Sequence, residues 1–66
     1  MTLEHVARRI ARMRARVAEL DFDHATALEA ELHDDVVLAM EVGSADVEHA
    51  RLALTTLNVD FPRRGQ

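Results

Sequence analysis

The first twenty residues repeat apolar side chains at alternating spacings of three and four, which is the spacing of a heptad seam along one face of an α-helix. Arginines and alanines occupy most of the positions in between, so the other faces of this helix are charged or small. An apolar stripe of this kind is stable only when other helices cover it, and it restricts the chain to helix-on-helix packing. The seam consists of Leu3, Val6, Ile10, Met13, Val17 and Leu20.

The seam predicts a first helix over about residues 2–20, with the Thr2 hydroxyl as its N-cap. A tight bend is expected next, where Asp21 or Asp23 can cap the following helix with its carboxylate. The apolar pattern then predicts a second helix over about residues 23–42. The chain therefore begins with a helical hairpin.

The second helix continues the apolar stripe, with one ambiguous position. A strict heptad register turns Glu29 toward the core, whereas its neighbour Leu28 is the apolar candidate for that place. We therefore expect the register to shift or the helix to rotate at this point. The remaining seam residues of this helix are Leu32, Val36, Ala39 and Met40.

A third, shorter helix is predicted over about residues 45–57, after Gly43 in a left-handed position and Ser44 as the N-cap. We expect residues 61–66 to form a mobile basic tail, from which Phe61 can dock onto the core. The predicted apolar stripe of the third helix consists of Val47, Ala50, Leu54 and Leu57.

These elements predict an all-α protein with a single domain over residues 1–60, built as an antiparallel helical hairpin plus a short third helix. A chain of 66 residues has a small core, and the absence of cysteine excludes disulfides as reinforcement. Self-association is the remaining way to add buried area, so we expect a homodimeric helical bundle in which the first and second helices form the interface.

Charge is distributed unevenly along the chain. Residues 1–20 contain five arginines and two acidic residues, whereas residues 21–60 contain ten acidic residues and one arginine. The arginines of the first helix can pair with the acidic second helix, for example with Glu29 or Asp35, or dock on an acidic protein, or contact RNA phosphates. The four that share one sector of the helix are Arg8, Arg9, Arg12 and Arg16.

Other chemistry finds little support in the sequence. Three His–carboxylate pairs have helical spacing, but they do not converge on one predicted face, so we expect no metal site and no cofactor. With no cysteine, one serine and two glycines, the chain lacks a nucleophile motif and a phosphate loop, and we expect no enzyme. No apolar run is long enough to span a membrane, and we expect a cytoplasmic protein.

The stretch from Leu20 to Asp34 resembles the turn and second helix of Rop-like proteins, which are small plasmid-encoded RNA-binding four-helix bundles formed by two hairpins. The shared residues are Leu20, Asp21 and Asp23 at the bend and Leu32-His33-Asp34 further along. The resemblance implies an antiparallel homodimer whose core contains the seam of the first helix, and it implies binding to a pair of RNA hairpins.

The same bend, from Ala18 to Asp23 with Ala25, is also similar to the UVR motif, a helical hairpin by which nucleotide-excision repair proteins and some stress regulators bind a partner hairpin. This second resemblance implies binding to another protein.

We therefore expect a small non-catalytic regulator or adaptor that acts through helix-mediated protein–protein interaction as a homo-oligomer. Its expected partners are a second copy of the chain and another protein, with no membrane involved. The alternative is a Rop-like RNA-binding dimer that uses the arginine face of the first helix, and a third class is a metal-binding helical bundle.

Overall fold

The computed structural model describes residues 1–63, and every regular element within them is helical. α1 spans Leu3–Ala18, α2 spans Phe22–Glu41 and α3 spans Val47–Leu54. A short 3₁₀ helix, η1, follows directly over Thr55–Asn58. The all-α class and the three predicted helices are confirmed, and each helix begins and ends close to the expected residues.

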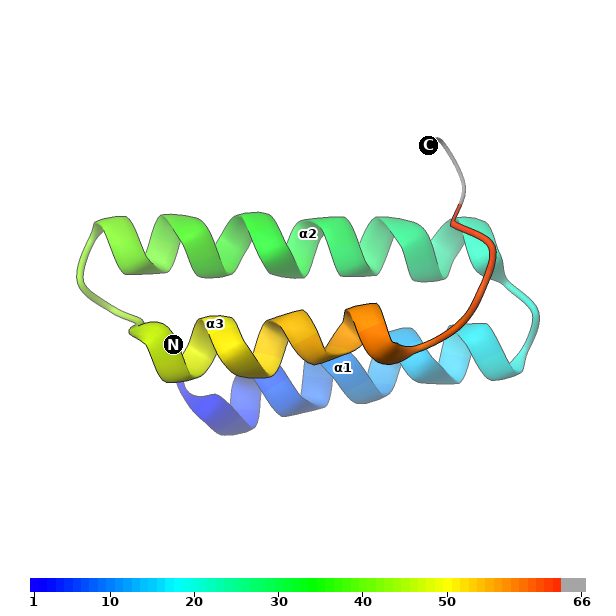
Figure 1. The fold of residues 1–66 in the computed structure, drawn as a ribbon, viewed down its shortest axis with the longest axis horizontal. Helices are drawn as coiled ribbons and strands as arrows, with labels where there is room; N and C mark the ends of the chain where they lie inside the picture. Colours follow the sequence, from blue (N-terminus) through cyan, green and yellow to red (C-terminus); the bar gives the residue numbers. More distant parts are fainter. Residues whose placement is uncertain (64–66) are drawn as a thin grey trace.

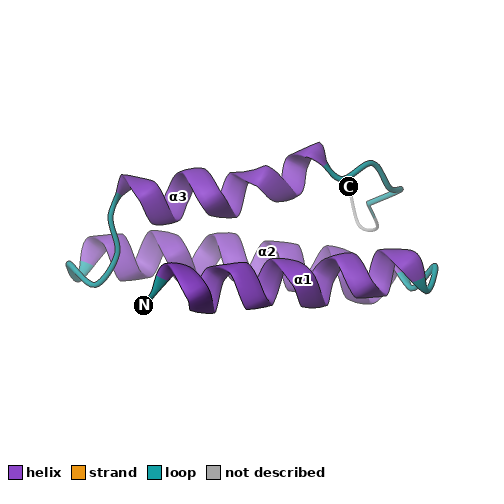
Figure 2. Cartoon of the chain, turned by 90° about the horizontal axis from the view of Figure 1, so that it is seen from below, coloured by secondary structure: helices purple, strands orange, loops and turns teal. Residues whose placement is uncertain are grey.

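The three helices run back and forth along one axis (Figure 1). α1 and α2 form the predicted antiparallel hairpin, and α3 returns antiparallel to α2 and packs against both helices of the hairpin (Figure 2). The N-terminus lies beside the start of α3, where the Met1 ammonium donates to the Ser44 carbonyl at 3.2 Å. Within residues 1–63, no helix is long and apolar enough to cross a membrane.

Side-chain caps fix where the helices begin. The Thr2 hydroxyl accepts from the backbone N–H of His5, as predicted, and Asp21, one of the two predicted candidates, caps α2 with its carboxylate. The cap of α3 differs from the prediction, because Asp46 rather than Ser44 is its N-cap. Asp46 and His49 form a reciprocal capping box, while the Ser44 hydroxyl donates to the Ala39 carbonyl at 3.3 Å.

Two residues in the left-handed conformation end the long helices. Gly43 has φ 79° after α2, as predicted, and a Cβ at this position would meet no atom within 4 Å, so the backbone angle rather than space favours glycine there. Leu20 has φ 61° after α1, which is unusual for a branched residue. Its side chain is 74% exposed.

The core consists of two clusters along the hairpin. Seven of the ten predicted seam residues are buried or half-buried in the single chain, and Val6 and Met13 are fully enclosed. The other three seam residues, Leu3, Leu20 and Met40, lie on the surface of the chain. The first cluster contains Val6, Leu32, Val36 and Ala53, and the second contains Met13, Ala25 and Phe61.

α3 presents a different face to the hairpin from the one predicted. Ala53 of α3 and Thr56 of η1 are buried, whereas Val47, Leu54 and Leu57 of the predicted stripe are each more than half exposed. Small side chains at the contact let α3 approach the groove between α1 and α2 closely, and the large side chains then lie beside the groove. The apolar spacing alone could not distinguish these two faces.

The segment after η1 is packed rather than free. Phe61 is 7% exposed within the second cluster, and Arg63 bonds to α2, so residues 61–63 do not form the expected mobile tail. The docking of Phe61 onto the core is confirmed. The rest of the expected tail, residues 64–66, lies outside the described residues.

Candidate functional site

A buried carboxylate is the most unusual feature of the molecule. Glu29 faces inward, as the strict heptad register required, and it is 5% exposed. The Arg63 guanidinium binds it through two hydrogen bonds, Nε to Oε1 at 2.9 Å and Nη2 to Oε2 at 3.0 Å. The hydrogen bond from Arg63 is the main cause that lowers the pKa of Glu29, against burial, which raises it.

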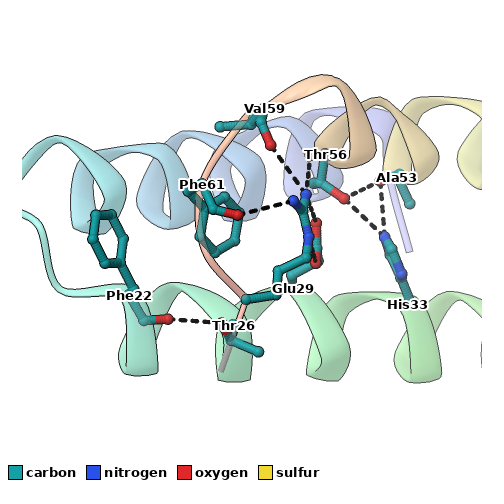
Figure 3. A network of polar contacts seen from close by, with 9 residues as sticks. Phe22, Thr26, Glu29, His33, Ala53, Thr56, Val59 and Phe61 are labelled. Atoms are coloured by element: carbon teal, nitrogen blue, oxygen red, sulfur yellow. Dashed lines mark hydrogen bonds and ion pairs between the residues drawn. The ribbon is translucent and has the colours of Figure 1, made fainter. Parts of the chain in front are cut away.

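The same guanidinium organises the backbone around it. Arg63 Nη2 also donates to the carbonyls of Thr56 and Val59, each at 3.1 Å, and Nη1 donates to the carbonyl of Phe61 at 3.4 Å (Figure 3). The guanidinium lies over the Phe61 ring, 4.2 Å from its centroid. The final described residue therefore ties η1 and the C-terminal segment to α2.

A histidine extends this polar network one turn along α2. His33 Nε2 lies 3.1 Å from the Ala53 carbonyl and 2.9 Å from the Thr56 hydroxyl (Figure 3). Because a carbonyl can only accept, the contact to Ala53 requires the proton on Nε2. The fully buried Thr56 hydroxyl in turn donates to the Ala53 carbonyl at 3.1 Å, so His33 joins α2 to both α3 and η1.

An aromatic pair closes the end of the bundle at the α1–α2 bend. The rings of Phe22 and Phe61 stack with centroids 6.2 Å apart and an interplanar angle of 25°. Beneath them lie Met13 and Ala25, neither of which has any exposed surface. Residues 59–63 thus cover the apolar contact between the two long helices at this end.

Two of the four arginines of the predicted face form ion pairs, and the other two are exposed. Arg9 binds Asp35 at 2.7 Å and Arg16 binds Glu19 at 2.7 Å. Arg8 and Arg12 are exposed and form no ion pair with any residue in the described part of the chain. The predicted pairing with Asp35 is confirmed for Arg9, whereas Glu29 pairs with Arg63 and with no arginine of α1.

An apolar hollow of about 160 Å³ lies between α2 and α3. Its rims are Val37 and Met40 of α2 and Leu54 of α3, and Val36 and Ala53 line it as well. This volume is below the range of about 300–1,000 Å³ that small-molecule sites occupy. The hollow suits one or two protruding side chains of another protein better than a small ligand.

The exposed apolar residues continue beyond the hollow along α3. Val47 and Leu54 of α3 and Leu57 of η1 recur at helical spacing on the exposed side. Together with Val37 and Met40 they form what we call the α2–α3 face. Each of these five side chains is at least 40% exposed.

The spaced His–carboxylate pairs do not assemble into a larger group. His49 contacts Asp46 at 2.9 Å and His24 contacts Asp21 at 3.4 Å, both as local pairs at helix starts. Among residues 1–63, no three His, Asp or Glu side chains lie where they could hold one metal ion.

The sequence carried a partial signal for the buried network. A strict heptad register turns Glu29 inward, but a shift of register or a rotation of the helix was the expectation there, and only the docking of Phe61 was predicted. The roles of Arg63, Thr56 and His33 were not foreseen, because they depend on the path of the chain after α3. The available signal was Glu29 at a core position of the heptad pattern, since a buried carboxylate requires a cation as its partner.

No protein-family model matches the chain, and no curated protein or solved structure matches it either.

Proposed function

We propose that this chain is a small non-catalytic regulator or adaptor that acts through helix-mediated protein–protein contacts as a homo-oligomer. The observation that carries the proposal is the α2–α3 face, whose five large apolar residues are exposed in the single chain and three of which, Val37, Met40 and Leu54, line the hollow. Contiguous apolar surface of this kind is typical of interaction sites.

The exposed α2–α3 face also replaces the seam of α1 as the proposed interface between copies. The seam of α1 was expected to meet a second copy, but α3 of the same chain packs against the hairpin and contributes Ala53 to the cluster around Val6. The α2–α3 face is therefore the better candidate for self-association.

The charges that flank this face favour a second copy as its occupant. On the α2 side, Asp34 and Glu41 are the exposed neighbours of Val37, and on the α3 side Arg51 lies between Val47 and Leu54 in the helical repeat. A twofold axis through the hollow brings the α3 side of one copy to the α2 side of the other. Arg51, which forms an exposed pair with Glu48 at 3.5 Å in the single chain, then approaches carboxylates of the partner copy, and this charge arrangement supports a self-complementary face.

Light scattering and a matched pair of variants test the proposal. The wild-type chain should have at least twice the monomer mass of 7.4 kDa, and its unfolding midpoint should rise with protein concentration. Leu54→Lys should dissociate the assembly because it places a charge in the centre of the face. Val42→Lys adds the same charge at a residue that is 79% exposed and outside the face, and it should leave the mass unchanged.

Two results would contradict the proposal. A wild-type mass of 7.4 kDa at every concentration would exclude the homo-oligomer. Equal dissociation by Leu54→Lys and Val42→Lys would exclude the α2–α3 face as its interface.

A further inference from the structure

The C-terminal segment binds the hairpin through alternate side chains. Along residues 59–63, Phe61 is buried and Val59 and Arg63 are half-buried, whereas Asp60 and Pro62 are exposed. Residues two apart share one side of an extended chain, so Phe61 and Arg63 both point toward the hairpin. Pro62 restricts the residue before it to extended conformations and so favours this arrangement.

Side chains rather than a backbone ladder hold the segment in place. Within the described residues, its one backbone–backbone hydrogen bond runs from Val59 N–H to the Thr56 carbonyl, at 3.0 Å, and none joins it to α1 or α2. The segment can therefore leave the hairpin without breaking a backbone hydrogen bond of α1, α2 or α3, and the Val59 N–H bond that it makes belongs to the end of η1. Segments that are held by few backbone hydrogen bonds are among the first parts of a domain to open.

The surface beneath the segment has the composition of a recognition site. Glu29 offers a buried carboxylate to a guanidinium, and Thr56 offers its carbonyl to the same group. Met13, Phe22 and Ala25 provide an apolar bed for one aromatic ring. We call these five residues the Glu29 site.

A carboxylate is a poor choice for this position if stability were its only purpose. Replacing a buried ion pair with apolar side chains of similar volume is often neutral or stabilising, because the pair must first be desolvated. A buried Glu that engages both donor atoms of an Arg fork instead distinguishes Arg from other side chains.

We propose that the Glu29 site is a binding site for an extended peptide segment that carries Phe and, two residues later, Arg, and that the chain's own residues 59–63 occupy this site in cis. A partner protein with a Phe-x-Arg segment displaces them. Residues 59–63 then compete with the partner for the Glu29 site. Because they are tethered, they set the minimum affinity that a partner needs to displace them. The inference rests on the Glu29 site and does not depend on the α2–α3 face.

A labelled peptide with the sequence of residues 58–63 tests the site on full-length protein. The cis segment has an effective concentration on the order of 1 mM, so the peptide should bind the wild-type chain weakly but measurably. The double variant Phe61→Ala/Arg63→Gln removes both cis anchors and should bind the peptide at least about tenfold more tightly. Fluorescence polarisation gives both affinities, and the peptide should raise the melting temperature of the double variant.

Specificity controls separate recognition from general stickiness. Peptides with Phe61→Ala or Arg63→Lys should lose the enhanced affinity, since the first lacks the ring and the second lacks the two-pronged donor. Adding Glu29→Gln to the double variant should abolish enhanced binding. Adding Glu31→Gln instead, at an exposed acid two residues away, should preserve it.

Three outcomes would overturn the proposal. One is equal peptide affinity for the wild-type chain and a double variant that is still helical. Another is a double variant that is unfolded and stays unfolded with saturating peptide. The third is a wild-type chain that shows no binding at peptide concentrations well above the effective concentration of its own segment.

Discussion

Arg63 and Glu29 form a two-pronged ion pair between residues 34 positions apart, with the Glu29 side chain 7% exposed and the Arg63 side chain 17% exposed. The pair joins the C-terminal segment to the middle of α2. The Glu29 carboxylate lies in the apolar stripe of α2. A buried charge there is stable only because Arg63 neutralises it.

Arg63→Gln should therefore lower stability more than an ordinary surface substitution does. It leaves Glu29 enclosed without its cation, and we expect the free energy of unfolding to fall by about 2–3 kcal/mol. Glu29→Leu/Arg63→Met should recover most of this loss, since it removes both charges together. Urea unfolding followed by circular dichroism, in sulfate buffer to keep the variants folded, measures each value. An unchanged midpoint for Arg63→Gln would show that the pair contributes nothing.

The ion pair also predicts how stability depends on pH. The pKa of Glu29 in the folded chain lies below its ordinary value of 4.5, mainly because Arg63 hydrogen-bonds to the carboxylate. The folded state therefore holds this proton less tightly than the unfolded state, and the stabilisation is complete above pH 4.5 and is lost as the pH falls toward the lowered pKa.

Comparison with Glu29→Gln isolates this contribution. The pKa of Asp46 is also lowered, chiefly through its hydrogen bond with His49. Protonation of Asp46 therefore lowers stability in acid equally in the wild-type chain and in Glu29→Gln. The wild-type midpoint in urea should thus fall more steeply below pH 4.5 than that of Glu29→Gln. Parallel pH profiles would mean that Glu29 is not the group responsible.

The sequence predicted the helices well because their signals are local. Heptad spacing predicted α1, the acidic bend at Asp21 and Asp23 predicted the start of α2 to within one residue, and Gly43 predicted its end. Each signal lies within one turn of the backbone that it controls, so later packing could not override it.

The orientation of α3 and the path of residues 59–63 were beyond such reasoning. Apolar spacing on α3 fits two faces, and the choice depends on how closely Ala53 can approach the hairpin. The pairing of Glu29 with Arg63 is likewise non-local, because it requires the chain to turn back after η1. Both candidate sites depend on these non-local contacts. The arginine face of α1 follows from helical spacing alone, so it was the candidate that the sequence revealed.

Leu20 provides a test of whether the α1 seam extends to the bend. At φ 61° a leucine is strained, so Leu20→Gly should raise the free energy of unfolding by about 0.5–1 kcal/mol. Ala18→Gly, at the last residue of α1, has no such strain to relieve and should lower it by about 0.5–1 kcal/mol. Thermal unfolding distinguishes the two signs. Loss of stability and of oligomer mass in Leu20→Gly would instead place the Leu20 side chain in an interface between copies.

The last prediction separates structural from functional arginines on α1. The Arg9 side chain is 18% exposed and binds Asp35, so Arg9→Gln should lower the free energy of unfolding by about 0.5–1 kcal/mol. Asp35→Asn should remove the same interaction, and the double variant should lose less than the sum of the two single variants. Arg12→Gln, one turn away and without a partner among residues 1–63, should stay within about 0.5 kcal/mol of wild type.

RNA binding by the same variants tests the alternative function. We expect only weak, salt-sensitive binding by the wild-type chain, because its net charge is −4 and Arg9 and Arg16 are already paired. Arg8→Gln/Arg12→Gln should therefore leave RNA affinity close to that of wild type at physiological salt. If this pair of substitutions abolished a tight, shape-selective RNA complex while the unfolding midpoint stayed constant, the exposed arginines of α1 would be an RNA-binding surface, and the Rop-like function would replace the adaptor function proposed above.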